Sequence, residues 1–170
     1  MEIQPCTQNR YSDDKYIYSV DMMFAFTELF KKHLEIGSLK LNKPENILKS
    51  KVWARENSSN GKEEVFSPKN VIDNPKKYVS DFKRIQAADL AFPVFLHNGI
   101  IVDGYHRATK AALNGISEIK AYNFDNALMK KFRIGRNTKA DWEKTTQLPL
   151  DDFMEMFFDR FCCSKTQKCT

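Results

Sequence analysis

Residue types that bind phosphate groups are concentrated in one short segment near the middle of the chain. The segment has the sequence Val-Asp-Gly-Tyr-His-Arg over residues 102–107, and Thr109 follows two positions later. The apolar residues before it predict a strand, and the residues after Gly104 predict a helix. The first backbone N–H groups of a helix have no partner within the helix, and with the helix dipole they attract an anion. The segment therefore predicts a phosphate-binding turn at a helix start.

Each side chain of this turn has a role in that interpretation. Gly104 lets a ligand approach the backbone because it has no Cβ. Arg107 can bind a phosphate or carboxylate with two parallel hydrogen bonds, with His106 beside it. Thr109 can add a hydroxyl from the next turn. Asp103 can cap the helix, hold a Mg²⁺ ion or act as a base.

The same residues also fit a purely structural role. Asp103 can be only a helix cap, Gly104 only a turn residue, His106 a packed histidine and Arg107 a surface residue. The pattern Asp-Gly-x-His-Arg alone is weak, and its place between a hairpin and a helix makes it more specific. Both interpretations stay open at this point.

The turn belongs to a run of predicted elements that form one supersecondary unit. Asn98-Gly99 favours a tight hairpin turn because both residues tolerate positive φ. Asn114-Gly115 is a typical helix C-terminus. The predicted elements are a strand at 92–96, a return strand at 100–102, a helix at 105–113 and a strand at 119–124.

The residues before this unit predict a strand and several helices. Residues 16–20 predict a strand, and the next helix has Asp21 as its cap and Gly37 as its stop. Its apolar stripe predicts a core-facing surface, with Met22, Phe26, Leu29, Phe30, His33 and Leu34 as members. Residues 37–62 predict a connecting region. Ser67-Pro68 and Asn74-Pro75 each predict a helix start, the second helix covering 75–88.

After the unit, the pattern predicts a short helix at 126–132 and a basic, irregular segment at 133–146. An amphipathic helix is predicted at 149–162, and its apolar face is expected to dock onto the core. Residues 1–15 predict a loose leader. The expected organisation is thus a leader at 1–15, a domain at 16–135 and a C-terminal extension at 136–170.

The composition indicates a folded protein with a substantial core. The 170 residues are 42% hydrophobic and include 13 Phe, which argues against wholesale disorder. The formal charge of +5 is a mild bias towards anionic partners and does not by itself argue for DNA binding. No apolar run is long enough to span a bilayer, so we expect a soluble, intracellular protein.

The cysteines predict free thiols. They lie at Cys6, Cys162, Cys163 and Cys169, and none forms the Cys-x-x-Cys pair typical of a zinc site. A metal or acylation role for Cys162 and Cys163 is the alternative.

The central motifs resemble the ParB/sulfiredoxin superfamily. The resemblance covers residues 93–124, with Pro-Val-Phe-Leu, Ile-Val-Asp-Gly-Tyr-His-Arg and Ala-Ala-Leu-Asn-Gly in the family order. Sulfiredoxins carry a catalytic cysteine where this chain has Tyr105, so thiol chemistry is not available at that position. ParB partition proteins carry Gly-Glu-Arg-Arg and a further Arg. Here Gly104 and Arg107 match, whereas Tyr105, His106 and Thr109 differ.

A third branch of the superfamily, with Asp-Gly-His-His-Arg, is most similar and includes nucleotide-dependent kinases of free serine. Asp103, Gly104, His106 and Arg107 match this motif, and Tyr105 departs from its first His. The resemblance implies a small mixed α/β fold with a nucleotide (ADP, ATP or CTP) and Mg²⁺ at the turn. In that branch the acidic residue, the His and the Arg of the motif handle the phosphates and the metal, which implies Asp103 and His106 as catalytic residues and Asp103 as the metal ligand. The residues expected to bind the nucleotide are Gly104, Tyr105, His106, Arg107 and Thr109.

Such kinases also use a carboxylate near the first helix as a base, and Asp21, Glu28 and Glu56 are the candidates here. The expected function is binding of a nucleotide or phosphorylated small molecule, with Mg²⁺-dependent phosphotransfer or phosphohydrolysis as its chemistry. A DNA-binding module that uses the turn on backbone phosphates is the alternative, and a ParB-like nuclease is another.

Overall fold

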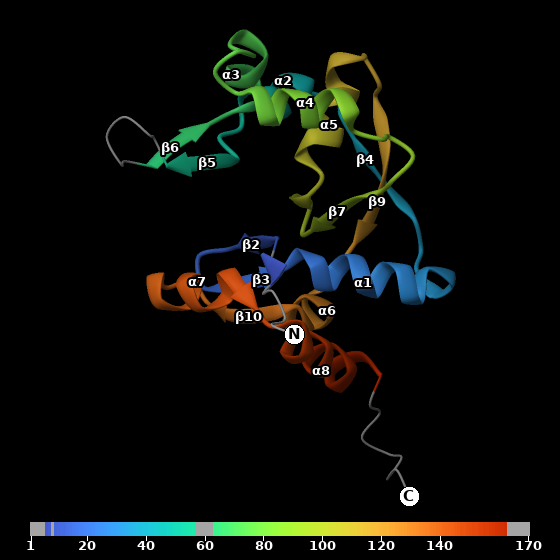
Figure 1. Cartoon of the computed structure of the whole chain (residues 1–170). Helices are drawn as coiled ribbons and strands as arrows, with labels where there is room; N and C mark the ends of the chain where they lie inside the picture. The colour runs from blue at the N-terminus through green and yellow to red at the C-terminus, as the bar shows by residue number, and fades with distance from the viewer. Residues whose placement is uncertain (1–5, 8, 57–62, 163–170) are drawn as a thin grey trace, which may run out of the picture. The chain divides into compact units, whose positions relative to one another are not determined.

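The computed structural model describes residues 6–7, 9–56 and 63–162 (Figure 1). Helices and strands alternate along these residues, so the predicted mixed α/β class is confirmed. The contacts divide the chain into two compact units. We call residues 35–123 the central unit and residues 1–34 with 124–170 the terminal unit. The predicted boundaries of leader, domain and extension stay a prediction.

The central unit contains a four-stranded sheet in the order β4-β9-β7-β8. The strands β7 and β9 are parallel, and the other two neighbouring pairs are antiparallel. The strands are β4 (Gly37–Lys40), β7 (Val94–His97), β8 (Ile100–Asp103) and β9 (Glu118–Asn123). The strand β8 ends where the predicted phosphate turn begins.

The hairpin and helix predicted on either side of the turn are confirmed. Asn98 and Gly99 have φ values of 50° and 76°, as a two-residue hairpin turn requires. The helix α5 (Tyr105–Leu113) has the predicted bounds, and Gly115 follows its end with φ 67°. Local residue types therefore determine this part of the fold.

Helices and a second hairpin surround α5. The helices α2 (Pro44–Lys49) and α4 (Val79–Ala87) both pack against it. The strands β5 (Trp53–Glu56) and β6 (Glu63–Phe66) form an antiparallel hairpin, followed by α3 (Pro68–Asp73).

Two apolar clusters stabilise the central unit. One joins the sheet to α5 and contains Leu41, Val94, Leu96, Ile101, Ala108, Ala111, Ile119 and Ala121. The other joins the hairpin to α3 and α4 and contains Phe66, Val71, Tyr78 and Ile85, with Trp53 and Phe82 packed against it.

Two predictions for the central unit were wrong. Residues 37–62 are not only a connection, because β4, α2 and β5 lie within them. The sequence of β4 has no β-branched residue, and this strand forms because it pairs with β9.

Ser67 caps α3 as predicted, but Asn74 ends that helix rather than starting the next. The N–H groups of Lys77 and Tyr78 both donate to the Asn74 carbonyl in a turn, and α4 begins only at Val79.

The terminal unit contains a three-stranded antiparallel sheet in the order β10-β3-β2. Its strands are β2 (Arg10–Ser12), β3 (Tyr16–Ser19) and β10 (Arg133–Arg136), and β1 (Cys6–Thr7) pairs separately with β11 (Gln147–Leu148). The leader expected at 1–15 therefore contains β1 and β2. The helices are α1 (Val20–Phe30) with a 3₁₀ turn at Lys31–His33, α6 (Asn126–Lys131), α7 (Lys139–Thr146) and α8 (Leu150–Phe161).

The predicted details of α1 need correction. The cap is Ser19, whose buried Oγ accepts a hydrogen bond from the Met22 N–H, whereas Asp21 lies inside the first turn. Gly37 does not stop this helix, because it lies in β4. Leu29 is 64% exposed, and Met23 is buried in its place. The buried face is therefore rotated from the predicted one.

The segment at 133–146 is also ordered, against the prediction of an irregular one. Its first part is β10, which pairs with β3. Its second part is α7, where the Thr138 hydroxyl accepts a hydrogen bond from the Asp141 N–H. That cap is a sequence signal for a helix start. The predicted final helix is confirmed as α8, with Phe153 and Phe157 buried. No helix among the described residues is long and apolar enough to cross a membrane.

Candidate functional site

The predicted turn is present where β8 meets α5. The strand ends at Asp103, Gly104 has a left-handed backbone with φ 106° and ψ 20°, and α5 begins at Tyr105. No side chain of the described residues caps this helix, and the Gly104 carbonyl accepts the first helical hydrogen bond, from the Ala108 N–H, at 2.9 Å. The first N–H groups of the helix are therefore donors that a ligand oxygen could accept from.

The Arg107 side chain folds back over the turn. Its Nη2 donates to Asp103 Oδ2 at 2.6 Å, one helical turn away along the chain. A Cβ on Gly104 would lie 2.8 Å from this Nη2 and 2.6 Å from Val94 Cγ1. The glycine is therefore required by the chain's own packing. The space directly over it, expected to admit a ligand, holds the Arg107 guanidinium.

Arg107 is also more buried than the purely structural interpretation expects, in which it is a surface residue. Its side chain is 15% exposed, and that of Asp103 is 31% exposed. The Arg107 Nε is buried and has no hydrogen-bond partner among the described residues. A buried donor without a partner is costly, and a ligand oxygen is one group that could satisfy it.

His106 lies between a carboxylate and an indole. Its Nε2 is 3.3 Å from Asp81 Oδ1 on α4, and its ring stacks on Trp53 of β5 with centroids 4.5 Å apart and planes 19° apart. Burial lowers the pKa of His106 below its usual value, against the raising effect of Asp81. The imidazole is therefore mainly neutral near pH 7. Asp81 and Trp53 were not predicted as site residues, because nothing in their local sequence connects them to residue 106.

Thr109 and Tyr105 face the interior. Thr109 is fully buried, and its Oγ1 has no hydrogen-bond partner within the described part of the chain. Tyr105 is partly buried against the apolar cluster between the sheet and α5.

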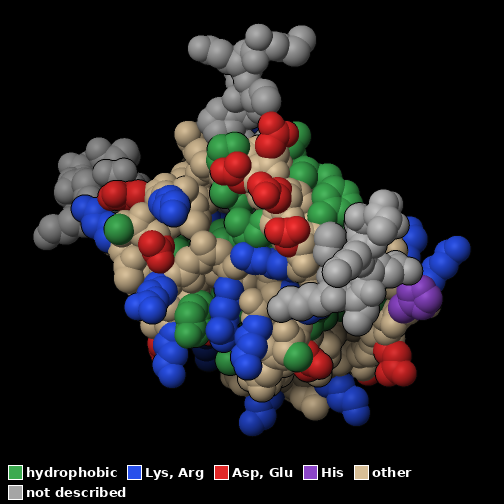
Figure 2. All heavy atoms as spheres, turned by 90° about the horizontal axis from the view of Figure 1, so that it is seen from below, with side chains coloured by type: hydrophobic (Ala, Val, Ile, Leu, Met, Phe, Trp, Pro, Cys, Tyr) green, Lys and Arg blue, Asp and Glu red, His purple; other side chains and the backbone are tan. Residues whose placement is uncertain are grey.

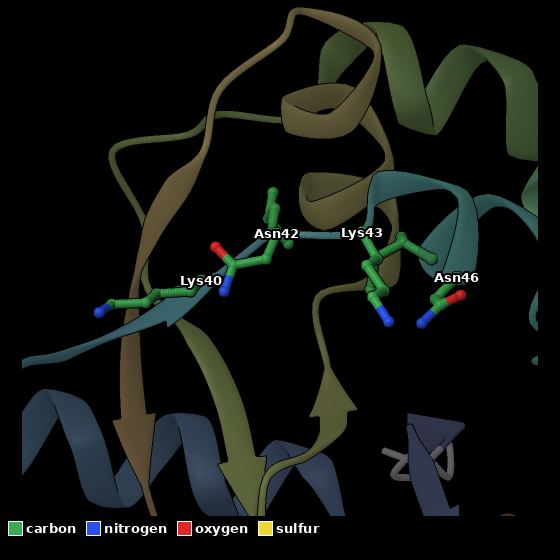
Figure 3. A pocket seen from close by; sticks show the side chains of 6 residues that line it. Lys40, Asn42, Lys43 and Asn46 are labelled. Carbon is green, nitrogen blue, oxygen red and sulfur yellow. The ribbon is translucent and has the colours of Figure 1, made fainter.

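A shallow pocket lies at the junction of β4 and α2. Lys40, Leu41, Asn42, Lys43, Asn46 and Ile47 line it, with a volume of about 370 Å³. Figure 3 shows the Lys43 and Asn46 side chains extending to the same side, whereas the Lys40 side chain points away along β4. The helix α2, which lines part of this pocket, packs against α5.

The candidate bases belong to different parts of the chain. Asp21 and Glu28 lie in the terminal unit, where Asp21 accepts two hydrogen bonds from Asn9 and Glu28 pairs with Lys31. The Glu56 side chain lies outside the described residues. The central unit itself supplies Glu45, an exposed residue in the first turn of α2.

The described part of the chain contains no cluster of metal ligands, either at the turn or elsewhere. Among residues 9–56 and 63–162, no group of three or more His, Cys, Asp or Glu side chains could hold a metal ion. Of the cysteines, Cys162 is an exposed thiol, and Cys163 and Cys169 lie outside the described residues. A single carboxylate at Asp103 suits Mg²⁺ only when phosphate oxygens and water complete its shell.

Comparisons with known proteins give no match: no family model, no curated protein and no solved structure resembles the chain closely enough to match it.

Proposed function

We propose that the chain is a ParB/sulfiredoxin-type protein that binds a nucleotide or phosphorylated small molecule at the turn formed by residues 103–107. The observation that carries this proposal is the conformation of Arg107. Its guanidinium lies over a left-handed glycine at a helix start, held by one carboxylate, and its buried Nε has no hydrogen-bond partner among the described residues.

A phosphate at this position would be bound by three kinds of group. The first N–H groups of α5 would donate to its oxygens. Arg107 would supply the positive charge, because a guanidinium can bind an oxyanion with two parallel bonds while Asp103 fixes its orientation. Asp103 would also hold a Mg²⁺ ion that shares the phosphate oxygens. Such an arrangement stabilises charge on a transferring phosphoryl group mainly by position and electrostatics.

Phosphoryl transfer to an acceptor needs a base as well. Asp21, Glu28 and Glu56 stay the candidates for this role. The described residues include no metal-ligand cluster that favours the nuclease alternative. Figure 2 shows acidic and apolar side chains beside the basic ones on the face that it draws.

A thermal-shift series tests the proposal. ADP, ATP and CTP are added to the whole chain with and without Mg²⁺, and the melting temperature is followed. A ligand that binds only the native state stabilises it by about 2.7 kcal/mol at a concentration of 100 Kd. We expect at least one nucleotide to raise the melting temperature, more strongly with Mg²⁺, and product analysis of the same samples reports turnover.

The matching control is adenosine, which lacks phosphate. An increase with adenosine equal to that with ATP would contradict a phosphate site. A duplex oligonucleotide is included as a second control. If it alone stabilised the protein, with an affinity that fell steeply with salt, the DNA-binding alternative would replace this proposal.

A further inference from the structure

The ring of His106 is fixed on two sides by residues distant in sequence. Asp81 approaches its Nε2 at 3.3 Å from α4, and Trp53 covers one ring face from β5. Both partners belong to the central unit, as does the turn. The side chains of His106 and Asp81 are 24% and 20% exposed, so the pair is largely shielded from water.

The carboxylate determines which ring nitrogen carries the proton. A carboxylate only accepts hydrogen bonds, so the Nε2 beside Asp81 is the protonated nitrogen of the neutral ring. Nδ1 has no hydrogen bond with any described residue. It is therefore the nitrogen left for a ligand, and it becomes a donor only when the ring takes up a second proton.

The indole fixes the plane of the ring. Trp53 is itself packed against Phe66, with ring centroids 5.9 Å apart, so the stacking surface is part of the second apolar cluster. The hairpin that carries Trp53 is tied to α4 and the residues before it, because Glu64 accepts hydrogen bonds from Arg55, Lys77 and Tyr78. Rotation of the imidazole would require this packing to open.

We propose that Asp81 and Trp53 are positioning residues of the phosphate site, which hold His106 with its Nδ1 towards the bound phosphate. The inference rests on the proposed function. It adds that the anion and a proton on Nδ1 bind together, so His106 contributes to phosphate binding as a cation and not as a neutral donor.

The charges around His106 determine the direction of the pH dependence. Asp81 and Arg84 face it from α4 and Asp103 from β8; the two carboxylates raise its pKa and Arg84 lowers it, while burial lowers it most. Nucleotide affinity should therefore rise as the pH falls through the pKa of His106. Removing the Asp81 charge should lower that pKa further, so the rise moves to lower pH.

The experiment combines NMR spectroscopy and calorimetry on the whole chain. Long-range ¹H–¹⁵N spectra distinguish the two tautomers, and a His106→Gln variant assigns the signal among the three histidines. The variants are Asp81→Asn and Trp53→Leu. Their controls are Asp73→Asn, which removes a carboxylate that pairs with Lys69, and Trp142→Leu, which removes an indole from the terminal unit.

We expect the wild type to show the Nε2–H tautomer and Asp81→Asn to lose this preference. ATP affinity of Asp81→Asn near pH 6.5 should fall about three- to tenfold, since one pKa unit corresponds to a tenfold change. Trp53→Leu should broaden the His106 signals and weaken ATP binding, and the controls should match the wild type. The wild-type tautomer is measured without Asp81→Asn or Trp53→Leu, so poor folding of either variant does not remove the test.

An Nδ1–H tautomer in the wild type would overturn the positioning role. ATP binding whose pH profile is the same in wild type and Asp81→Asn would overturn it too, while leaving the proposed function intact. Absence of ATP binding to the wild type between about pH 5 and pH 8 would instead refute the proposed function, and the ligand-facing role with it.

Discussion

Replacing Arg107 with alanine is expected to weaken nucleotide binding by about ten- to a hundredfold. Hydrogen bonds to a charged partner contribute roughly 1.5–3 kcal/mol each, and Arg107 is the cation that lies over the turn. Arg107→Lys should recover only part of the affinity, because an ammonium group cannot make two parallel bonds to one phosphate. Calorimetric titration with ATP and Mg²⁺ measures all three proteins.

The same variant should also reduce stability. A surface arginine at a helix start would matter little for folding. The structure instead encloses it, and alanine would leave the Asp103 carboxylate without its partner. We expect a loss of about 1–3 kcal/mol in the free energy of unfolding, measured with urea.

Arg136→Ala is the control, because Arg136 is exposed and lies in the terminal unit. It should change neither affinity nor stability by more than about 0.5 kcal/mol. If Arg107→Ala bound ATP as tightly as the wild type, Arg107 would be a structural residue alone.

The second large effect is expected at Gly104. A Cβ there would be 2.6 Å from Val94 Cγ1, and Val94 is fully buried in the core cluster. The φ of 106° adds strain, because residues with a side chain rarely adopt it. Strain of about 1–3 kcal/mol and overpacking of about 1–3 kcal/mol act together, so Gly104→Ala should lose roughly 2–6 kcal/mol in the free energy of unfolding.

Gly115→Ala is the matched control for the backbone effect. Gly115 also has a positive φ, of 67°, but a Cβ there would meet nothing within 4 Å. It should lose only about 1–2 kcal/mol. Urea denaturation of both variants separates the two contributions. Equal losses would show that close packing at Gly104 contributes nothing beyond its backbone conformation.

The sequence predicted the elements whose signals are local. Asn98-Gly99, Gly104 and Gly115 each require a positive φ, and the hairpin and α5 between them formed at the predicted residues. The strand β4 could not be predicted in this way, because Gly37–Lys40 has no strand signal of its own and depends on β9. The cap at Thr138 is a local signal for the start of α7, whereas the basic residues of 133–146 favour an irregular segment.

The residues of the candidate site also divide into those that local sequence predicts and those that only tertiary packing brings together. Asp103, Gly104 and Arg107 are neighbours in sequence, so their association could be predicted, although the ion pair that folds Arg107 back could not. Asp81 and Trp53 reach His106 from α4 and β5, and only tertiary packing brings them there. Thr109 was expected to face a ligand, but the helical rotation from Arg107 places it in the core.

Backbone amide NMR spectroscopy of the whole chain during an ATP–Mg²⁺ titration tests the central claim most directly. A phosphate at the helix start must perturb the N–H groups that bind it. The account predicts saturable shifts at Gly104, His106 and Arg107, which disappear in Arg107→Ala. Shifts confined to the Lys40–Ile47 pocket, or spread over exposed Lys and Arg residues without saturation, would contradict a phosphate site at this turn.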